Sequence, residues 1–210
     1  MGLGQWRNYA AICLLAIEAG DSSQTHYRQR YIDGIVTRNG EHANVLYKSS
    51  QPAGKFPALN PLMITLFDIK PGGMPENIRT EVYPLAFSRL RTECDFQSAL
   101  FDHEFYHRRQ IIKGVEFDAL YSNDMKKLFE LGNHDLNRLH TAFIELDAIY
   151  NEVKKGRYKN CLSEEWRKRT KYLWDYYYSI LNESDHEMPE FLAYLRAEFR
   201  KKGLELWQGN

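Results

Sequence analysis

The sequence predicts an α+β fold, with β-structure in the first half of the chain and helices in the second. Short runs rich in Ile and Val, separated by Gly and Pro, fill residues 25–85, whereas apolar residues recur at helical spacing across residues 93–206. A chain of 210 residues with 43% hydrophobic residues is large enough to build one core. We therefore expect a single domain that spans residues 1–210.

The β-containing part begins with a predicted hairpin in residues 31–47. Runs of β-branched and apolar residues lie on either side of the Asn-Gly pair at 39–40, which is a strong signal for a two-residue hairpin turn. A loop rich in proline follows, and the apolar run 62–69 predicts a further strand. Pro75 and Pro84 predict that the next stretch is irregular.

Helices are predicted wherever apolar positions alternate by three and four. The most amphipathic of them begins near Asn133 or Asp135 and ends before Gly156, because glycine commonly caps a helix C-terminus. Gly114 ends an earlier helix in the same way. The predicted helices span residues 6–19, 93–113, about 133–155, 163–181 and 189–206.

Charge and hydropathy exclude two classes of partner. Lys plus Arg and Asp plus Glu both number 28, so no overall positive charge attracts nucleic acid. The longest apolar run, 10–17, is far shorter than the roughly 20 residues that cross a bilayer. A buried helix explains this run better than a secretion signal, for which a single Arg7 precedes it. Nothing in the sequence indicates the oligomeric state.

The cysteines predict a reducing, cytoplasmic environment. Cys13, Cys94 and Cys161 are far apart in the sequence, and none belongs to a Cys-x-x-Cys pair. This spacing argues against a disulfide framework and against a zinc site built from cysteines.

One predicted helix carries the pattern of a zinc site. Residues 103–107 read His-Glu-Phe-Tyr-His, which places His103 and His107 one turn apart on one face of the helix. Two imidazoles in this position can reach one Zn²⁺ at about 2.0–2.1 Å. Glu104 projects beside them, where its carboxylate can take a proton from a metal-activated water. The spacing therefore predicts two metal ligands and a general base.

This motif resembles the active-site helix of the zincin metallopeptidases. The metzincin branch is excluded, because Gln110 and Lys113 stand where that branch has a glycine and a third histidine. The gluzincin branch takes its third ligand from a glutamate on a later helix, and the resemblance therefore implies Glu145 or Glu152. We favour Glu145, which lies at the border of the apolar stripe, and keep Glu152 in reserve.

The resemblance implies hydrolysis of peptide bonds, with Zn²⁺ as cofactor and a peptide or protein as substrate. The strand at 62–69 would then pair with an extended substrate along a sheet edge. Asp147 is a candidate for orienting a histidine ligand. Six side chains are candidate donors to the oxyanion of the transition state: His134, His140, Tyr158, Tyr176, Tyr177 and Tyr178.

Two other functions remain open. Glu104-x-x-His107 and Glu183-x-x-His186 both fit the Glu-x-x-His element of carboxylate-bridged di-iron bundles, although Pro189 and the proline-rich first half disfavour a four-helix bundle. A non-enzymatic interaction domain with a coincidental motif would hold no metal. The zinc metallopeptidase is the function that we favour.

Overall fold

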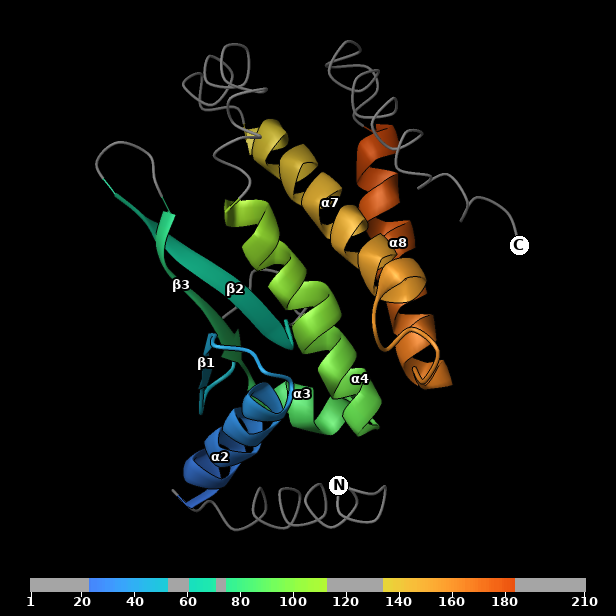
Figure 1. Ribbon diagram of the computed structural model, residues 1–210. Coiled ribbons are helices and arrows are strands. Elements are labelled where there is room, and N and C mark those ends of the chain that lie inside the picture. The colour runs from blue at the N-terminus through green and yellow to red at the C-terminus, as the bar shows by residue number, and fades with distance from the viewer. Residues whose placement is uncertain (1–22, 53–60, 71–74, 113–133, 184–210) are drawn as a thin grey trace.

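The computed structural model describes residues 23–52, 61–70, 75–112 and 134–183. These residues form a mixed α+β structure, as predicted, with one three-stranded sheet and several helices (Figure 1). In chain order, with η marking π-helical segments, the elements are α2 (Ser23–Arg38), β1 (Asn44–Tyr47), β2 (Met63–Ile69), β3 (Pro75–Val82), α3 (Pro84–Arg89), α4 (Glu93–Gln97), η2 (Ser98–Glu104), α7 (His134–Tyr150), η3 (Asn151–Lys155) and α8 (Glu164–Glu183).

The sheet has the strand order β1-β3-β2, with β3 parallel to β1 and antiparallel to β2. Strand β2 confirms the strand predicted at 62–69. The irregular stretch predicted after Pro75 is wrong, because β3 begins at that residue, and a proline is tolerated at the first position of a strand. The register shifts between Leu66 and Asp68, and Asn77 has a φ of 50°, so a bulge accommodates the irregularity within the sheet.

The hairpin predicted across residues 31–47 is wrong, because its first half belongs to helix α2. Ile32, Ile35 and Val36 are buried, and their spacing of three and four places them on one face of a helix. Strand β1 then pairs with β3 instead of folding back on residues before Gly40.

The Asn-Gly pair ends the helix α2 and makes no hairpin turn. Gly40 has a left-handed φ of 67°, and its N–H donates to the carbonyl of Thr37 at 3.0 Å. The N–H of Glu41 donates to the carbonyl of Val36 at 3.2 Å. These two bonds form a Schellman motif, in which a glycine satisfies the last carbonyls of a helix. A left-handed glycine occurs both in hairpin turns and at helix C-termini, so the Asn-Gly pair alone does not distinguish the two.

The outer edge of β1 is satisfied by a side chain of α2. The amide of Gln29 donates to the carbonyl of Val45 at 2.9 Å and accepts from the N–H of Tyr47 at 2.7 Å. These are the bonds that a neighbouring strand would make. Gln29 thereby protects an edge that would otherwise be open to pairing with another chain.

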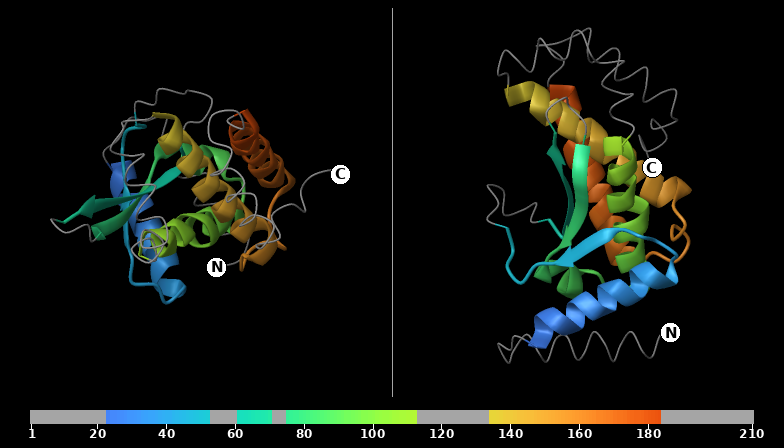
Figure 2. Two further views of the ribbon diagram at one scale, coloured as in Figure 1. Left: turned by 90° about the horizontal axis from the view of Figure 1, so that it is seen from above. Right: turned by 60° about the vertical axis from the view of Figure 1, so that its left-hand side comes forward.

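The helix formed by α4, η2 and residues 105–112 lies between the sheet and the α7–α8 pair (Figures 1 and 2). It confirms the helix predicted at 93–113 as far as residue 112. The helix predicted at about 133–155 is confirmed as α7 continued by η3, and the one predicted at 163–181 is confirmed as α8.

Two predicted helices, at 6–19 and 189–206, lie outside the described residues. The apolar run 10–17, which we weighed as a secretion signal, lies there as well.

An aromatic cluster fixes the start of the central helix. The ring of Phe96 in α4 lies 5.4 Å from both Phe87 and Tyr31, measured between ring centroids. Phe96 is fully buried, so it joins α2 and α3 to the helix that carries the zinc motif.

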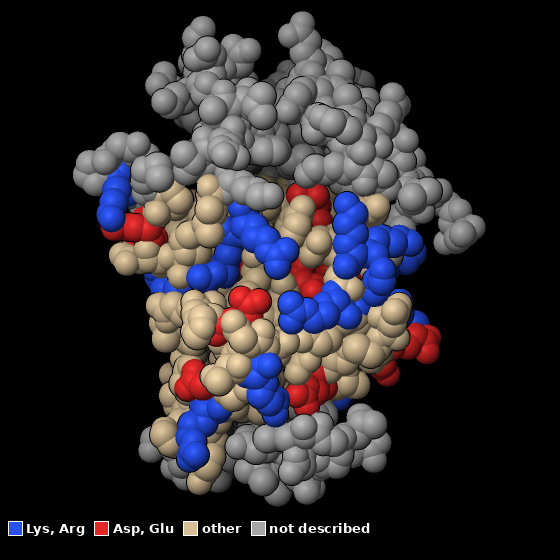
Figure 3. Space-filling view, in the orientation of Figure 1, with Lys and Arg blue, Asp and Glu red and all other residues tan. Residues whose placement is uncertain are grey.

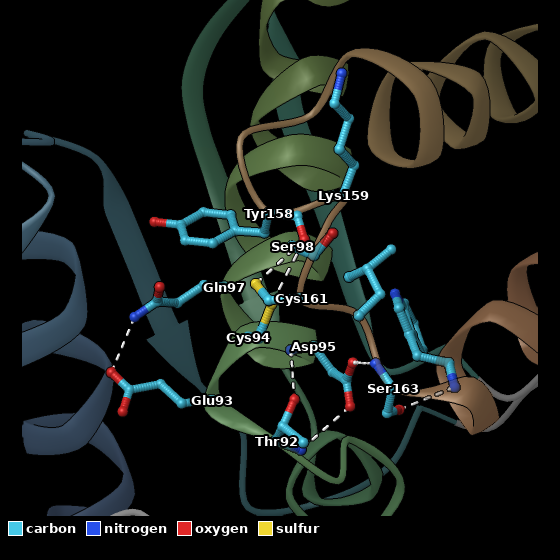
Figure 4. The surroundings of a disulfide bond; sticks show 12 residues. Thr92, Glu93, Cys94, Asp95, Gln97, Ser98, Tyr158, Lys159, Cys161 and Ser163 are labelled. Carbon is cyan, nitrogen blue, oxygen red and sulfur yellow. Dashed lines mark hydrogen bonds between the residues drawn. A yellow bond between two sulfur atoms is a disulfide. The ribbon is translucent and has the colours of Figure 1, made fainter. Parts of the chain in front are cut away.

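A disulfide joins Cys94 in α4 to Cys161 in the loop before α8, with their Cα atoms 6.0 Å apart (Figure 4). The prediction that the cysteines do not form disulfides is therefore wrong. Spacing in the sequence could not reveal the pair, because the two cysteines are 67 residues apart and meet only in the folded chain. Disulfides persist mainly in oxidising compartments, so the cysteines no longer support the cytoplasmic location, which stays a prediction.

Lys and Arg cover more of the face shown in Figure 3 than Asp and Glu do, and acidic side chains lie between them. The sequence as a whole has balanced charge. Within the described part of the chain, no helix combines the length and the apolar character that a membrane span requires.

Gly34 inside α2 and Gly40 just after its end test whether a helix, rather than the predicted hairpin, occupies this part of the chain. We expect Gly40→Ala to destabilise the protein by roughly 1–2 kcal/mol, because an alanine is strained at a left-handed φ. Gly34→Ala should instead stabilise it by about 0.5–1 kcal/mol, because Gly34 lies inside the helix and a Cβ there meets no atom within 4 Å. Urea unfolding measures both changes, and equal effects of the two substitutions would contradict the helix end assigned here.

Candidate metal centre

The central helix starts at a capping box and changes its winding at the zinc motif. Thr92 accepts a hydrogen bond from the N–H of Asp95 at 3.0 Å, and the Asp95 carboxylate accepts from the N–H of Thr92 at 3.2 Å. The π-helical segment η2 then carries His103 and Glu104. Short π-helical segments within α-helices occur frequently at functional sites.

His103, His107 and Glu145 come together as the sequence predicts, from η2, residues 105–112 and α7. Nε2 of His103 lies 3.2 Å from Nε2 of His107 and 3.3 Å from Oε2 of Glu145. Nε2 of His107 lies 3.6 Å from Oε1 of Glu145. Ligand atoms at about 2.0–2.1 Å from a tetrahedral ion are separated by about 3.3–3.4 Å. The three side chains therefore fit a single metal ion, and they are the one such group in the described residues.

Glu152 contacts the other nitrogen of His103, rather than serving as the reserve ligand that we considered. Its Oε2 lies 3.3 Å from Nδ1 of His103. Its Oε1 accepts hydrogen bonds from Ser98 at 3.0 Å and from the indole N–H of Trp166 at 2.6 Å. A carboxylate only accepts, so the proton of the neutral imidazole is held on Nδ1 and the lone pair of Nε2 is left for a metal.

His107 is oriented in the same way by an amide. Its Nδ1 lies 2.7 Å from Oε1 of Gln110, whose Nε2 donates to the carboxylate of Asp147 at 3.1 Å and to the carbonyl of Ile144 at 3.3 Å. These two acceptors fix the amide orientation, so Oε1 faces His107 and accepts its proton. Asp147, which also accepts from Tyr106 at 3.0 Å, thus acts on His107 through Gln110.

Glu104 is buried against the sheet. The hydroxyl of Thr65 in β2 donates to Oε2 of Glu104 at 2.9 Å, and the hydroxyl of Thr80 in β3 lies 3.1 Å from that of Thr65. Burial raises the pKa of the Glu104 carboxyl, and the charges of His107 and His103 act in the opposite direction. The raised pKa makes Glu104 a stronger base than an exposed glutamate.

The ligand atoms influence one another strongly. Burial alone would lower the pKa of His103, but hydrogen bonds and charges from Glu145 and Glu152 raise it well above its usual range. Glu145 also raises the pKa of His107 against the effect of burial, while the two histidines lower the pKa of Glu145. A metal ion would therefore displace protons when it binds these groups.

Gly156 lets the loop after η3 approach the central helix. A Cβ at this position would lie 2.4 Å from Oδ2 of Asp102 and 2.5 Å from the carbonyl of Glu152. The same Asp102 oxygen accepts from the N–H of Tyr158 at 2.8 Å. Only glycine permits this close contact with Asp102, the residue directly before His103.

The other predicted residues fall into three groups. Tyr177 in α8 is partly buried, and burial first and then the charge of Glu145 raise its pKa, which makes its hydroxyl a weaker donor to an oxyanion. Tyr158 instead donates to Asn39 at 2.6 Å. No geometry near the site is described for the remaining candidates and for the second Glu-x-x-His element: His134, His140, Tyr176, Tyr178, Glu183 and His186.

The residues that support the ligands were mostly not predicted. Gln110 could have been found, because it lies one turn after His107 on the same helix. Ser98, Thr65 and Trp166 had no such signal, since each reaches the site from another turn or another element.

The sequence matches no protein-family model, and no curated protein or solved structure is significantly similar to it.

We expect Glu152→Gln to weaken Zn²⁺ binding by about 10–100-fold, because the carboxylate that orients His103 is lost. Competition with a chromophoric chelator measures the affinity. Glu165→Gln, which changes an exposed glutamate of α8, is the matched control and should bind as tightly as the unchanged protein. Unchanged affinity in the Glu152 variant would contradict its role.

Proposed function

We propose that this protein is a zinc-dependent metallopeptidase of the gluzincin type. His103, His107 and Glu145 would hold the ion, and Glu104 would act as general base. The observation that carries the proposal is the ligand geometry: the two Nε2 atoms lie 3.2 Å apart, with that of His103 3.3 Å from Oε2 and that of His107 3.6 Å from Oε1 of the Glu145 carboxylate. Acceptors on both Nδ1 atoms leave both Nε2 lone pairs free for coordination.

The proposed chemistry needs a nucleophile, a base and a proton donor. Zinc in such a site lowers the pKa of a water to about 7 and so supplies a nucleophile at neutral pH. Glu104 takes the proton of the attacking water and passes it to the amine that leaves. Its burial supports this role, because a carboxylate with a raised pKa takes a proton from the attacking water more readily than an exposed glutamate does.

The sheet offers a place for a peptide substrate. Among the described strands, β2 has a partner, β3, on one side only. An extended peptide can add to such an edge through main-chain hydrogen bonds. Thr65 of β2 also donates to Glu104, so the edge strand and the base are held together. This proximity supports a peptide as the substrate class, in line with the resemblance to zincins.

The site favours one ion over the di-iron alternative. The described residues contain one metal-binding group, and it offers two histidines and one carboxylate. Carboxylate-bridged di-iron centres in bundles use four carboxylates and two histidines on four helices. The second acidic side chain at the site, Glu152, accepts from Ser98 and Trp166 and faces Nδ1 of His103, so it supports a ligand.

The decisive experiment is Glu104→Gln. The substitution removes the base and keeps the shape of the side chain, so we expect stoichiometric zinc and a loss of about 10²–10⁴-fold in kcat/KM. Zinc is measured by elemental analysis and cleavage with a library of quenched fluorescent peptides. Glu165→Gln again serves as the control. Full activity of the Glu104→Gln variant would rule out the mechanism. If elemental analysis finds no zinc in the protein with its original sequence, the metal site is ruled out.

Thr65 tests the link between the edge strand and the base. We expect Thr65→Val to keep zinc and to lower kcat by about tenfold or more, because a hydrogen bond to a charged group contributes about 1.5–3 kcal/mol. Thr65→Ser retains the hydroxyl and should recover most of the rate. If the valine and serine variants are equally active, the hydroxyl does not position Glu104.

A further inference from the structure

The disulfide closes a loop of the chain that contains the whole proposed metal site. Cys94 and Cys161 are 67 residues apart in the sequence. The proposed ligands, the proposed base and the carboxylate behind His103 all lie between the two cysteines: His103, Glu104, His107, Glu145 and Glu152. The cross-link therefore limits how far these groups can move apart.

A second connection runs beside the disulfide through Glu152. Cys94 lies one helical turn before Ser98, whose hydroxyl donates to Oε1 of Glu152 at 3.0 Å. Cys161 lies five residues before Trp166, whose indole N–H donates to the same oxygen at 2.6 Å. The central helix and the segment 161–166 are thus linked twice, covalently by the disulfide and through hydrogen bonds to the carboxylate of Glu152.

The loop that carries Cys161 also forms hydrogen bonds with the central helix at Asp95, between Cys94 and Ser98, and at Asp102, one turn after Ser98. The N–H of Ser163 donates to Asp95 at 2.8 Å, and the N–H of Tyr158 donates to Asp102 at 2.8 Å (Figure 4 draws the first of these). Asp102 directly precedes His103. The loop therefore contacts the helix at the turn that presents the first ligand.

We propose that the redox state of Cys94 and Cys161 controls how tightly the site binds zinc. This inference rests on the proposed function. A dithiol reductant breaks the Sγ–Sγ bond, delivers two electrons and two protons to the two cysteine sulfurs, and becomes a disulfide itself. The loop 156–163 is then held only by its hydrogen bonds and by the packing of Leu162 and Tyr158 on the core, and the donors of Glu152 are less firmly placed behind His103.

The coupling must act in both directions. If the disulfide raises zinc affinity by some factor, bound zinc favours the disulfide over the two thiols by the same factor. The expected difference in zinc affinity follows from the role of Glu152, because loss of a carboxylate contact behind a metal ligand weakens metal binding by about 10–100-fold. We expect at least the lower value, about tenfold.

The test compares oxidised and reduced full-length protein in a Cys13→Ser background, so that the only thiols are those of the disulfide. The protein is reduced with a dithiol, freed from it by gel filtration without oxygen, and titrated with Zn²⁺ against a chelating indicator. We expect affinity about tenfold lower than in the oxidised protein. A Cys94→Ser, Cys161→Ser double variant should match the reduced form. Arg38→Gln is the control, because it removes an ion pair with Glu93 in the same turn and leaves the disulfide intact.

Equal affinity of the oxidised and reduced proteins would overturn the inference and leave the proposed function standing. No zinc binding by either form would overturn the proposed function. If the reduced protein loses its helical circular dichroism, Ser98→Ala provides the answer in the oxidised state. This substitution removes the hydrogen bond from Ser98 to Glu152 and keeps the disulfide. A several-fold loss of zinc affinity supports the inference, and full affinity overturns it.

Discussion

The arrangement of the proposed site depends on the buried carboxylate of Glu152. A charge that is almost completely removed from water is stable only when its oxygens have partners. Oε1 of Glu152 accepts hydrogen bonds from Ser98 in the central helix and from Trp166 in α8, whereas Oε2 accepts no hydrogen bond from the described residues and lies 3.3 Å from Nδ1 of His103. The central helix, η3 and α8 must therefore meet at one side chain, and this requirement fixes how η3 faces η2.

The contact between His103 and Glu152 joins the two π-helical segments, η2 and η3. Segment η2 carries His103 and Glu104, and η3 carries Glu152. A π-helical turn holds more residues than an α-helical one, so it rotates the residues after it relative to those before it. Glu145 and Glu152 are seven positions apart, yet one faces Nε2 of His103 and the other Nδ1. The two carboxylates thereby hold opposite sides of one imidazole.

Sequence reasoning found what local spacing determines. The zinc motif and the helices around it follow from residues three or four apart, where one helix fixes the geometry, whereas Glu145 on a later helix was expected from the resemblance to gluzincins. It failed where two backbone states share one signal, as at Gly40, whose left-handed φ ends a helix as readily as it turns a hairpin. It also failed for Thr65, Trp166 and the disulfide, because partners from different elements leave no periodic trace.

The charges of the site explain how it could exist both with and without an ion. Against the effect of burial, the charge of Glu145 raises the pKa values of His103 and His107, and the two histidines lower that of Glu145, so without an ion the protonated imidazoles and the ionised carboxylate stabilise each other. One Zn²⁺ with two neutral imidazoles has the same total charge as two imidazolium groups, so an exchange of the two protons for one ion leaves the buried charge unchanged. Glu104 differs from Glu145, because its burial raises the pKa more than the charges of His107 and His103 lower it. The desolvation that makes the Glu104 carboxylate costly to bury is thus the property that suits it to accept a proton.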